Sequence, residues 1–251
     1  MLRTKLWNVL LVSSLLLFAS CSPKVKTKLT KMAEPLGDNA TVVTLFPSQN
    51  QPIAEQIGTF RVGERGLTIG CTYDVIMRMA RIDARQKGAN IVHIERIKEP
   101  SGGSTCFTFF GSYYKVPDIY AFQDSLNAIE NEITKQVFNG DTSYAIVHIY
   151  RPRSGYGWAV NYKMHLDDST LFKVKNGSYQ IIRIDRQECY RFWAATESTT
   201  ETRLCIKAGE EYFLQCGVDM GAFIGRPRIT LVDKPLGRSE TEKLRKNSET
   251  E

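Results

Sequence analysis

The second half of the chain is a run of short β-rich segments separated by turn residues, and this pattern restricts the possible folds most. Between positions 142 and 234 the segments recur about every 8–12 residues. The predicted strands are 143–150, 158–166, 170–174, 178–185, 189–195, 202–208 and 211–218, with 228–233 as an edge strand or packing segment. Asn176-Gly177 is a hairpin signal between two of them. The pattern predicts an antiparallel β-sandwich domain over residues 141–235.

An amphipathic helix is predicted directly before these strands. Apolar residues recur every three or four positions between 118 and 139, and Gly140 follows them. These residues are Phe122, Leu126, Ile129, Ile133 and Val137. The apolar stripe covers fewer than three heptads, which favours a packing or spacer helix over a coiled coil. We therefore expect a connecting helix over residues 118–140.

Residues 41–117 combine four predicted strands with one helix, which indicates a small α+β domain. The strands are 41–46, 57–62, 90–97 and 106–116. The helix begins near Tyr73, where Thr72 or Asp74 can cap it. Gly88 occupies the position where a left-handed residue commonly ends a helix. The whole chain is therefore predicted to be of the α+β class.

The N-terminus has the composition of an export signal. Arg3 and Lys5 precede an apolar run of 13 residues, 6–18, which is shorter than the roughly 20 residues that span a bilayer. Small residues at 19 and 20 then precede Cys21. This order resembles the lipobox of bacterial lipoproteins, although Phe18 stands where Leu, Val or Ile is more usual. The resemblance implies that a signal peptide, 1–20, is removed and that Cys21 is lipidated with diacylglycerol and a further acyl chain such as palmitate.

The same resemblance has implications for location. Ser22, rather than Asp, follows the cysteine, which implies anchoring in the outer membrane, facing the periplasm. Residues 21–40 lack apolar periodicity and are predicted to be a lipidated tether. The alternatives are an uncleaved signal anchor, or a secreted protein in which Cys21 pairs with another thiol.

Five cysteines remain after Cys21, an odd number that leaves at least one free thiol or an intermolecular bond. Cys71 precedes the predicted helix and Cys106 begins the last strand of its domain, so a helix packed across the sheet would bring them together. We predict a Cys71–Cys106 disulfide, with two buried free thiols as the alternative. The other three cysteines are Cys189, Cys205 and Cys216. The expected turns place Cys205 nearer to phenylalanines than to a cysteine, so this pairing stays open.

Both domains resemble envelope lipoproteins. Residues 41–116 look like the outer-membrane lipoprotein sensor of the Rcs envelope-stress system, on the pattern Cys71, Ala80, Ala84, Gly88-Ala89-Asn90 and Cys106. This resemblance implies a small disulfide-linked α/β sandwich. That sensor has two disulfides, and Glu95 and the 111–112 region stand where its other pair would be.

The second domain resembles a family of bacterial lipoprotein domains of unknown function. The segments that carry the match are 145–152, 160–167, 175–179, the strand around Trp193 and 207–213. Residues 185–188 depart from the family, which usually has a Pro-Gly turn there. The match implies a fold and an envelope context, without an activity.

Charge and motifs exclude several classes of function. The net charge is +6, but residues 1–31 carry six bases and no acid, which leaves 27 of the 33 basic residues against all 27 acidic ones. This balance removes the electrostatic argument for nucleic-acid binding. The three histidines are scattered, without metal-ligand spacing, and no nucleophile or phosphate-loop motif occurs. We therefore expect no catalytic residue, no metal site and no cofactor.

The sequence thus predicts a lipid-anchored envelope lipoprotein that is a non-catalytic binding or sensing module. Its expected partners are the membrane, through the N-terminal lipid, and an envelope protein or peptidoglycan. The alternative is an envelope enzyme, or a protein that binds a small ligand or a metal between its domains. Residues 236–251 are charged and are predicted to be a disordered tail.

Overall fold

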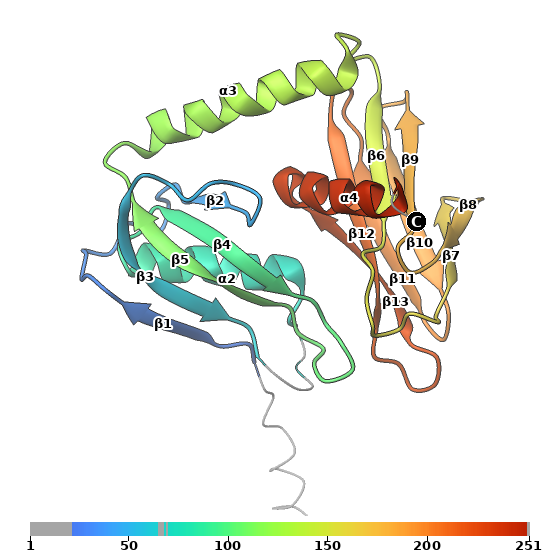
Figure 1. Ribbon diagram of the computed structural model, residues 1–251, viewed down its shortest axis with the longest axis horizontal. Helices are drawn as coiled ribbons and strands as arrows, with labels where there is room; N and C mark the ends of the chain where they lie inside the picture. The colour runs from blue at the N-terminus through green and yellow to red at the C-terminus, as the bar shows by residue number, and fades with distance from the viewer. Residues whose placement is uncertain (1–21, 65–67, 69, 250–251) are drawn as a thin grey trace, which may run out of the picture.

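A computed structural model describes residues 22–64, 68 and 70–249. Its N-terminal unit is one five-stranded sheet in the order β1-β3-β5-β4-β2, with α2 packed across one face (Figure 1). The elements are β1 (Val25–Leu29), β2 (Val43–Leu45), β3 (Glu55–Val62), α2 (Tyr73–Gln86), β4 (Ile91–Lys98) and β5 (Thr108–Lys115). β2 and β4 are parallel, and the other neighbouring strands are antiparallel.

Helix α2 forms where the sequence predicts it. Its buried side chains Ile76, Ala80 and Ala84 recur at helical spacing and face the sheet. Gly88 has a φ of +76°, the left-handed conformation expected after the helix. A side chain there would meet the backbone of Glu34, so the glycine also allows the preceding segment to pass close to the helix end.

The predicted tether over residues 21–40 is wrong at residues 25–29, which form strand β1. This strand pairs antiparallel with β3, with Val25 opposite Val62 and Leu29 opposite Gly58. Val25, Thr27 and Leu29 alternate with lysines, a period of two that suits an edge strand with one solvated face. The hydroxyl of Thr27 also donates to the carboxylate of Asp83 in α2. Only residues 22–24 therefore separate position 21 from the folded sheet.

The C-terminal unit is a β-sandwich, as predicted. One sheet has the order β11-β10-β7-β8 and the other β13-β12-β6-β9. The strands are β6 (Ala145–Tyr150), β7 (Tyr162–Leu166), β8 (Ser169–Val174), β9 (Tyr179–Ile184), β10 (Cys189–Ala195), β11 (Thr199–Cys205), β12 (Glu211–Asp219) and β13 (Arg226–Val232). Val147 and Leu214 of one sheet pack with Phe192 of the other in a common core. One pair, β6 and β12, is parallel rather than antiparallel.

Two strands of the sandwich begin three or more residues away from their predicted start. The segment 158–161 precedes β7 as a turn, and Trp158 within it is exposed instead of filling the core. β11 begins at Thr199 rather than at 202, because β10 and β11 are joined by only three residues, 196–198. This short turn sets a pairing register between β10 and β11 that differs from the predicted one.

The connecting helix α3 (Ile119–Phe138) is confirmed. The carboxylate of Asp118 caps it by accepting hydrogen bonds from the backbone N–H groups of Tyr120 and Ala121, each at 3.0 Å. Asn139 ends it in the left-handed conformation, with a φ of +47°. In Figure 1, α3 crosses from the sheet of the N-terminal unit to the start of β6.

The C-terminal tail is a helix, α4 (Lys234–Glu249), and not a disordered segment. Leu236, Thr241 and Leu244 are buried, and the two leucines belong to a core cluster shared by both units. Gly237 lies directly against the ring of Phe213 in β12, so the helix backbone can approach the sheet closely. The charged residues that suggested disorder occupy much of the rest of the helix.

Candidate functional site

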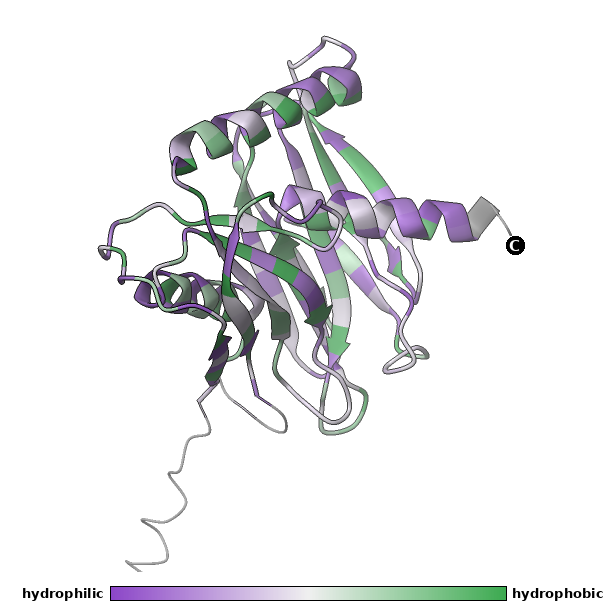
Figure 2. Ribbon diagram, turned by 60° about the vertical axis from the view of Figure 1, so that its left-hand side comes forward, coloured by the Kyte–Doolittle hydropathy of each residue, from purple (hydrophilic) through white to green (hydrophobic). Residues whose placement is uncertain are grey.

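An open groove of about 600 Å³ lies between α3, α4 and the loop that joins β2 to β3. Its lining is largely apolar. The apolar lining residues are Leu45, Pro52, Ile53, Phe122, Leu126, Ile129, Ile133 and Pro235. Of the twenty residues of α3, only Phe138 is fully buried, and Ile129 is 58 % exposed. Figure 2 shows α3 in alternating green and purple bands, as expected for an apolar stripe on an otherwise polar helix.

The edge of the groove is a chain of paired charges. Arg238 of α4 donates to both carboxylate oxygens of Glu130 in α3, at 2.6 and 2.8 Å, and also to buried Glu211 in β12. Glu211 in turn lies 3.0 Å from the Nε2 atom of His148, whose Nδ1 atom lies 2.8 Å from the hydroxyl of Tyr179. Burial alone would raise the pKa of Glu211, but hydrogen bonds from His148 and Arg238 outweigh it and lower the pKa. These contacts tie α3 to the sandwich.

Polar contacts also fix the two units against each other. The Tyr73 hydroxyl of α2 donates to Asp233 at 2.8 Å, and Ser48 donates to the carbonyl oxygen of Pro235 at 3.1 Å. Arg228 of β13 pairs with Glu99, which follows β4. The groove therefore lies between units whose relative position is held by specific hydrogen bonds.

A cluster of partly buried acidic groups lies beside this interface. Glu240 of α4 accepts hydrogen bonds from Tyr150 at 2.7 Å and from Gln215 at 2.8 Å, and Gln215 also contacts Glu99. Burial, with the charge of Glu99 nearby, raises the pKa of Glu240. Burial alone would lower the pKa of Arg228, but the charges of Glu99 and Asp219 raise it. The cluster stabilises the junction and lies away from the groove lining.

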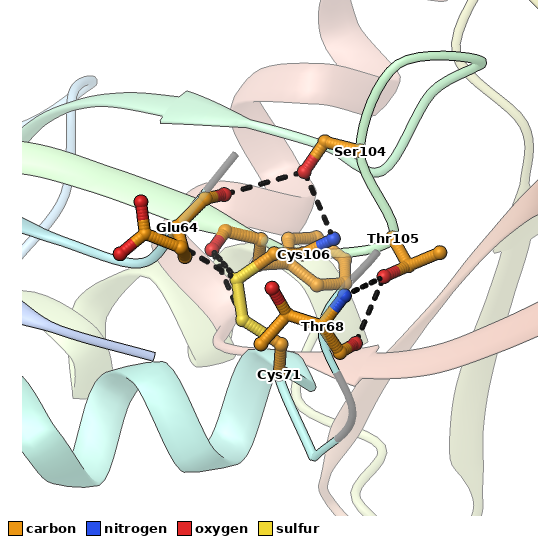
Figure 3. The surroundings of a disulfide bond; sticks show 7 residues. Glu64, Thr68, Cys71, Ser104, Thr105 and Cys106 are labelled. Atoms are coloured by element: carbon orange, nitrogen blue, oxygen red, sulfur yellow. Dashed lines mark hydrogen bonds between the residues drawn. A yellow bond between two sulfur atoms is a disulfide. The ribbon is translucent and has the colours of Figure 1, made fainter. Parts of the chain in front are cut away.

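The predicted Cys71–Cys106 disulfide is present. It joins the entry of α2 to the segment leading into β5 (Figure 3). The backbone N–H of Glu64 donates to the sulfur of Cys106 at 3.3 Å, and Thr68 and Thr105 are linked by hydrogen bonds of 2.8 Å. The other predicted site residue, Cys21, lies outside the described residues, as does the predicted signal peptide over 1–20.

A side-chain hydrogen bond joins β4 to β5. The hydroxyl of Ser112 in β5 donates to the carboxylate of Glu95 in β4 at 2.6 Å.

A second disulfide, Cys189–Cys205, was left open by the sequence and is present in the sandwich. The three-residue turn places Cys189 directly opposite Cys205 in neighbouring strands. Cys216 stays a free thiol in the core, and burial raises its pKa to about 12. The short turn was the signal that could have identified this pair.

The described residues contain no group of three or more side chains suited to hold a metal ion. His93 is buried near Tyr114, and His165 stacks on Trp193 with 4.0 Å between ring centroids. Arg151, beside a glycine-rich loop, is buried and donates to the carbonyl oxygens of Val160 and Gly157 at 2.6 Å. His165 and Arg151 therefore have structural partners, whereas the buried Nδ1 atom of His93 has no hydrogen-bond partner among the described residues.

No protein-family model matches the sequence, and comparison with curated proteins gives no match either. Among the described helices, none is long and apolar enough to span a membrane. The groove beneath α3, lined by α3, α4 and the β2–β3 loop, is the candidate binding site.

Proposed function

We propose that this protein is a lipoprotein of the bacterial outer membrane, anchored through Cys21, and that it binds an amphipathic segment of another envelope protein in the groove beneath α3. The observation that carries the binding proposal is the apolar stripe of α3: the described residues leave Ile129 and Val137 exposed and cover Phe122, Leu126 and Ile133 only in part. The order of charged, apolar and small residues before Cys21 supports the anchor.

Binding is favoured over catalysis by the chemistry of the groove. Most of its lining surface is apolar, and the half-buried charged residues at its edge, Glu130 and Arg238, are already paired with each other. A general acid or base needs access to substrate and a proton it can give or take. Both groups are instead held as a bidentate ion pair that fixes two helices, which suits a rigid binding surface.

The length of the stripe favours a protein segment as the occupant. Phe122 and Ile133, the first and last residues of α3 that line the groove, are eleven residues apart, a distance of about 16 Å along the helix axis. This length matches about three turns of a partner helix, whose residues at i, i+3, i+4 and i+7 could lie along the stripe. The polar groups at the groove edge would face the polar side of such a helix.

Site-specific crosslinking in intact cells tests the binding proposal. A photoreactive residue replaces Ile129 in the groove or, as control, Ile181, which is exposed on β9 outside the groove. We expect a defined protein adduct at position 129, absent at 181, that is lost when Leu126→Asp is added. Equal adducts at both positions, or an adduct unaffected by Leu126→Asp, would contradict the proposal.

Labelled palmitate tests the anchor separately. We expect the parent chain to incorporate label and to fractionate with the outer membrane, and the Cys21→Ser variant to do neither. Two or three acyl chains anchor stably, whereas one binds reversibly. An unchanged distribution of Cys21→Ser would contradict the anchor.

Native mass spectrometry tests the class of occupant in the groove. A co-purifying lipid of defined mass that is lost in the Leu126→Asp variant would favour a small apolar ligand in the groove over a protein segment.

A further inference from the structure

The loop between β12 and β13 presents two apolar side chains to solvent on a fixed backbone. Phe223 is 92 % exposed and Ile224 is also exposed. The carboxylate of Glu197 accepts hydrogen bonds from the backbone N–H groups of residues 222, 223 and 224, at 2.7, 2.9 and 3.1 Å. These bonds lower the pKa of Glu197 to about 2. Both side chains are therefore exposed on a loop whose backbone is held in one conformation by hydrogen bonds.

A third exposed apolar side chain lies on the neighbouring segment. Trp158 is 66 % exposed, and the residues on either side of it are held in place by Arg151, which binds the carbonyl oxygens of Gly157 and Val160. Gly157 lies against Val218, at the end of β12 that leads into the Phe223 loop. Trp158 and the loop therefore belong to the same end of the sandwich.

The same end of the molecule receives the chain from position 21. The carbonyl oxygen of Lys24 accepts a hydrogen bond from the N–H of Gly63, at 3.0 Å. The next residue, Glu64, accepts one from Ser104, in the loop after β4. Gly102 of that loop lies against the ring of Tyr156. In Figure 1 the start of β1, the β4–β5 loop and the β12–β13 loop all lie along the lower edge of the molecule.

Covalent geometry keeps any lipid on Cys21 close to this edge. Three peptide units join position 21 to Lys24, which limits their Cα atoms to about 11 Å apart. A chain held this tightly cannot turn freely above a bilayer, as a chain on a long flexible tether could.

We propose that the β12–β13 loop is a second membrane contact, in which Phe223, Ile224 and Trp158 insert into the leaflet that holds the Cys21 lipid. This inference rests on the proposed anchor and adds an orientation to it. Tryptophan is enriched at membrane–water interfaces, and an ordered loop loses little conformational freedom on insertion. Lys24, exposed at the same edge, is placed to meet anionic head groups.

The orientation also places the binding groove away from the membrane. Ile53, which lines the groove, precedes β3, whereas Gly63 beside Lys24 follows it. An eight-residue strand of about 26 Å separates the two ends. The groove therefore opens where a protein partner can approach it without displacing lipid.

Fluorescence quenching in vesicles tests the contact. The lipidated mature protein, which begins at Cys21 and so lacks Trp7, is reconstituted into phosphatidylethanolamine–phosphatidylglycerol vesicles that contain brominated acyl chains. A reporter tryptophan is placed by Phe223→Trp or, as matched control, by Ile53→Trp, each with Trp158→Phe and with Trp193 as constant background. Both reporter positions are exposed, so neither substitution disturbs the core. We expect quenching at position 223 at least about three-fold greater than at position 53.

Failure of this inference is distinguishable from failure of the anchor. Protein that sediments with the vesicles but shows equal quenching at both positions would overturn the loop contact and leave the anchor standing. Protein that does not sediment with the vesicles would overturn both. With native Trp158 as the reporter, Phe223→Ser is expected to reduce its quenching by about half, whereas Ile53→Ser leaves it unchanged. An equal effect of both substitutions would also overturn the contact.

Discussion

Replacement of Arg228 tests whether the two units are coupled as the structure indicates. The guanidinium of Arg228 pairs with Glu99 of the N-terminal unit and with Asp219 at 2.9 Å, and it lies over the ring of Phe107. Removal of one partner of a buried ion pair costs about 3–5 kcal/mol. Glu99 and Asp219 are 31 % and 36 % exposed, so water can partly solvate them once the arginine is gone. We therefore expect Arg228→Met to lower the free energy of unfolding by about 2–3 kcal/mol.

Urea denaturation with two probes measures this effect. In protein without residues 1–20, which lacks Trp7, the tryptophans are Trp158 and Trp193. Both lie in the C-terminal unit, so their fluorescence reports that unit, whereas circular dichroism reports the whole chain. The two transitions should coincide in the parent and separate in Arg228→Met. The control is Arg191→Met, which removes an exposed pair with Glu201 and should cost less than about 1 kcal/mol.

A double-mutant cycle refines the test. Glu99→Gln removes the charge that Arg228→Met leaves without its partner, so the double variant should lose less stability than the sum of the single variants, by about 1–2 kcal/mol. Strict additivity, or coincident transitions with a loss below about 0.5 kcal/mol in Arg228→Met, would refute the coupling.

Three further predictions concern stability. Replacement of Cys71 and Cys106 together by alanine should cost about 4 kcal/mol in urea denaturation, because their disulfide closes 35 residues; an unchanged midpoint would contradict this. Gly237→Ala should lower the free energy of unfolding by about 1–3 kcal/mol and speed hydrogen exchange in α4, because the added methyl group meets the ring of Phe213. Unchanged exchange would show that α4 does not need the close approach to Phe213. Glu240→Gln should gain stability relative to the parent as pH rises. The raised pKa of Glu240 means that its contribution is complete below its ordinary value of 4.5 and is lost as pH rises through the folded-state pKa. Urea titrations from about pH 4 to pH 8 measure this, and a constant difference would count against it.

Local patterns predicted much of the fold. The stripe of α3, the end of α2 at Gly88 and the Cys71–Cys106 disulfide all depend on residues within one element or at the ends of neighbouring elements. Strand β1 is a local pattern that the sequence prediction missed. Its alternation of Val25, Thr27 and Leu29 is a strand signal, but the lysines between them suggested a solvated linker.

Features that depend on tertiary contacts could not be predicted in the same way. The charged composition of α4 outweighed the spacing of Leu236 and Leu244, whose burial requires the surface of the neighbouring sheet. Prediction of the groove requires two things: the apolar stripe on α3, and the knowledge that the other described residues do not cover this stripe completely. Local periodicity predicts only the first. The Cys189–Cys205 pair depends on a register set by one short turn.

The buried thiol of Cys216 has a consequence for how the chain matures. Burial covers this sulfur and raises the pKa of the thiol, and the thiolate is the species that attacks a disulfide. Once β12 is in the core, this sulfur can therefore neither exchange with the two existing bonds nor link two copies of the chain. Errors of cysteine pairing are confined to the interval before the sandwich closes, so correct oxidation depends on how quickly its sheets come together.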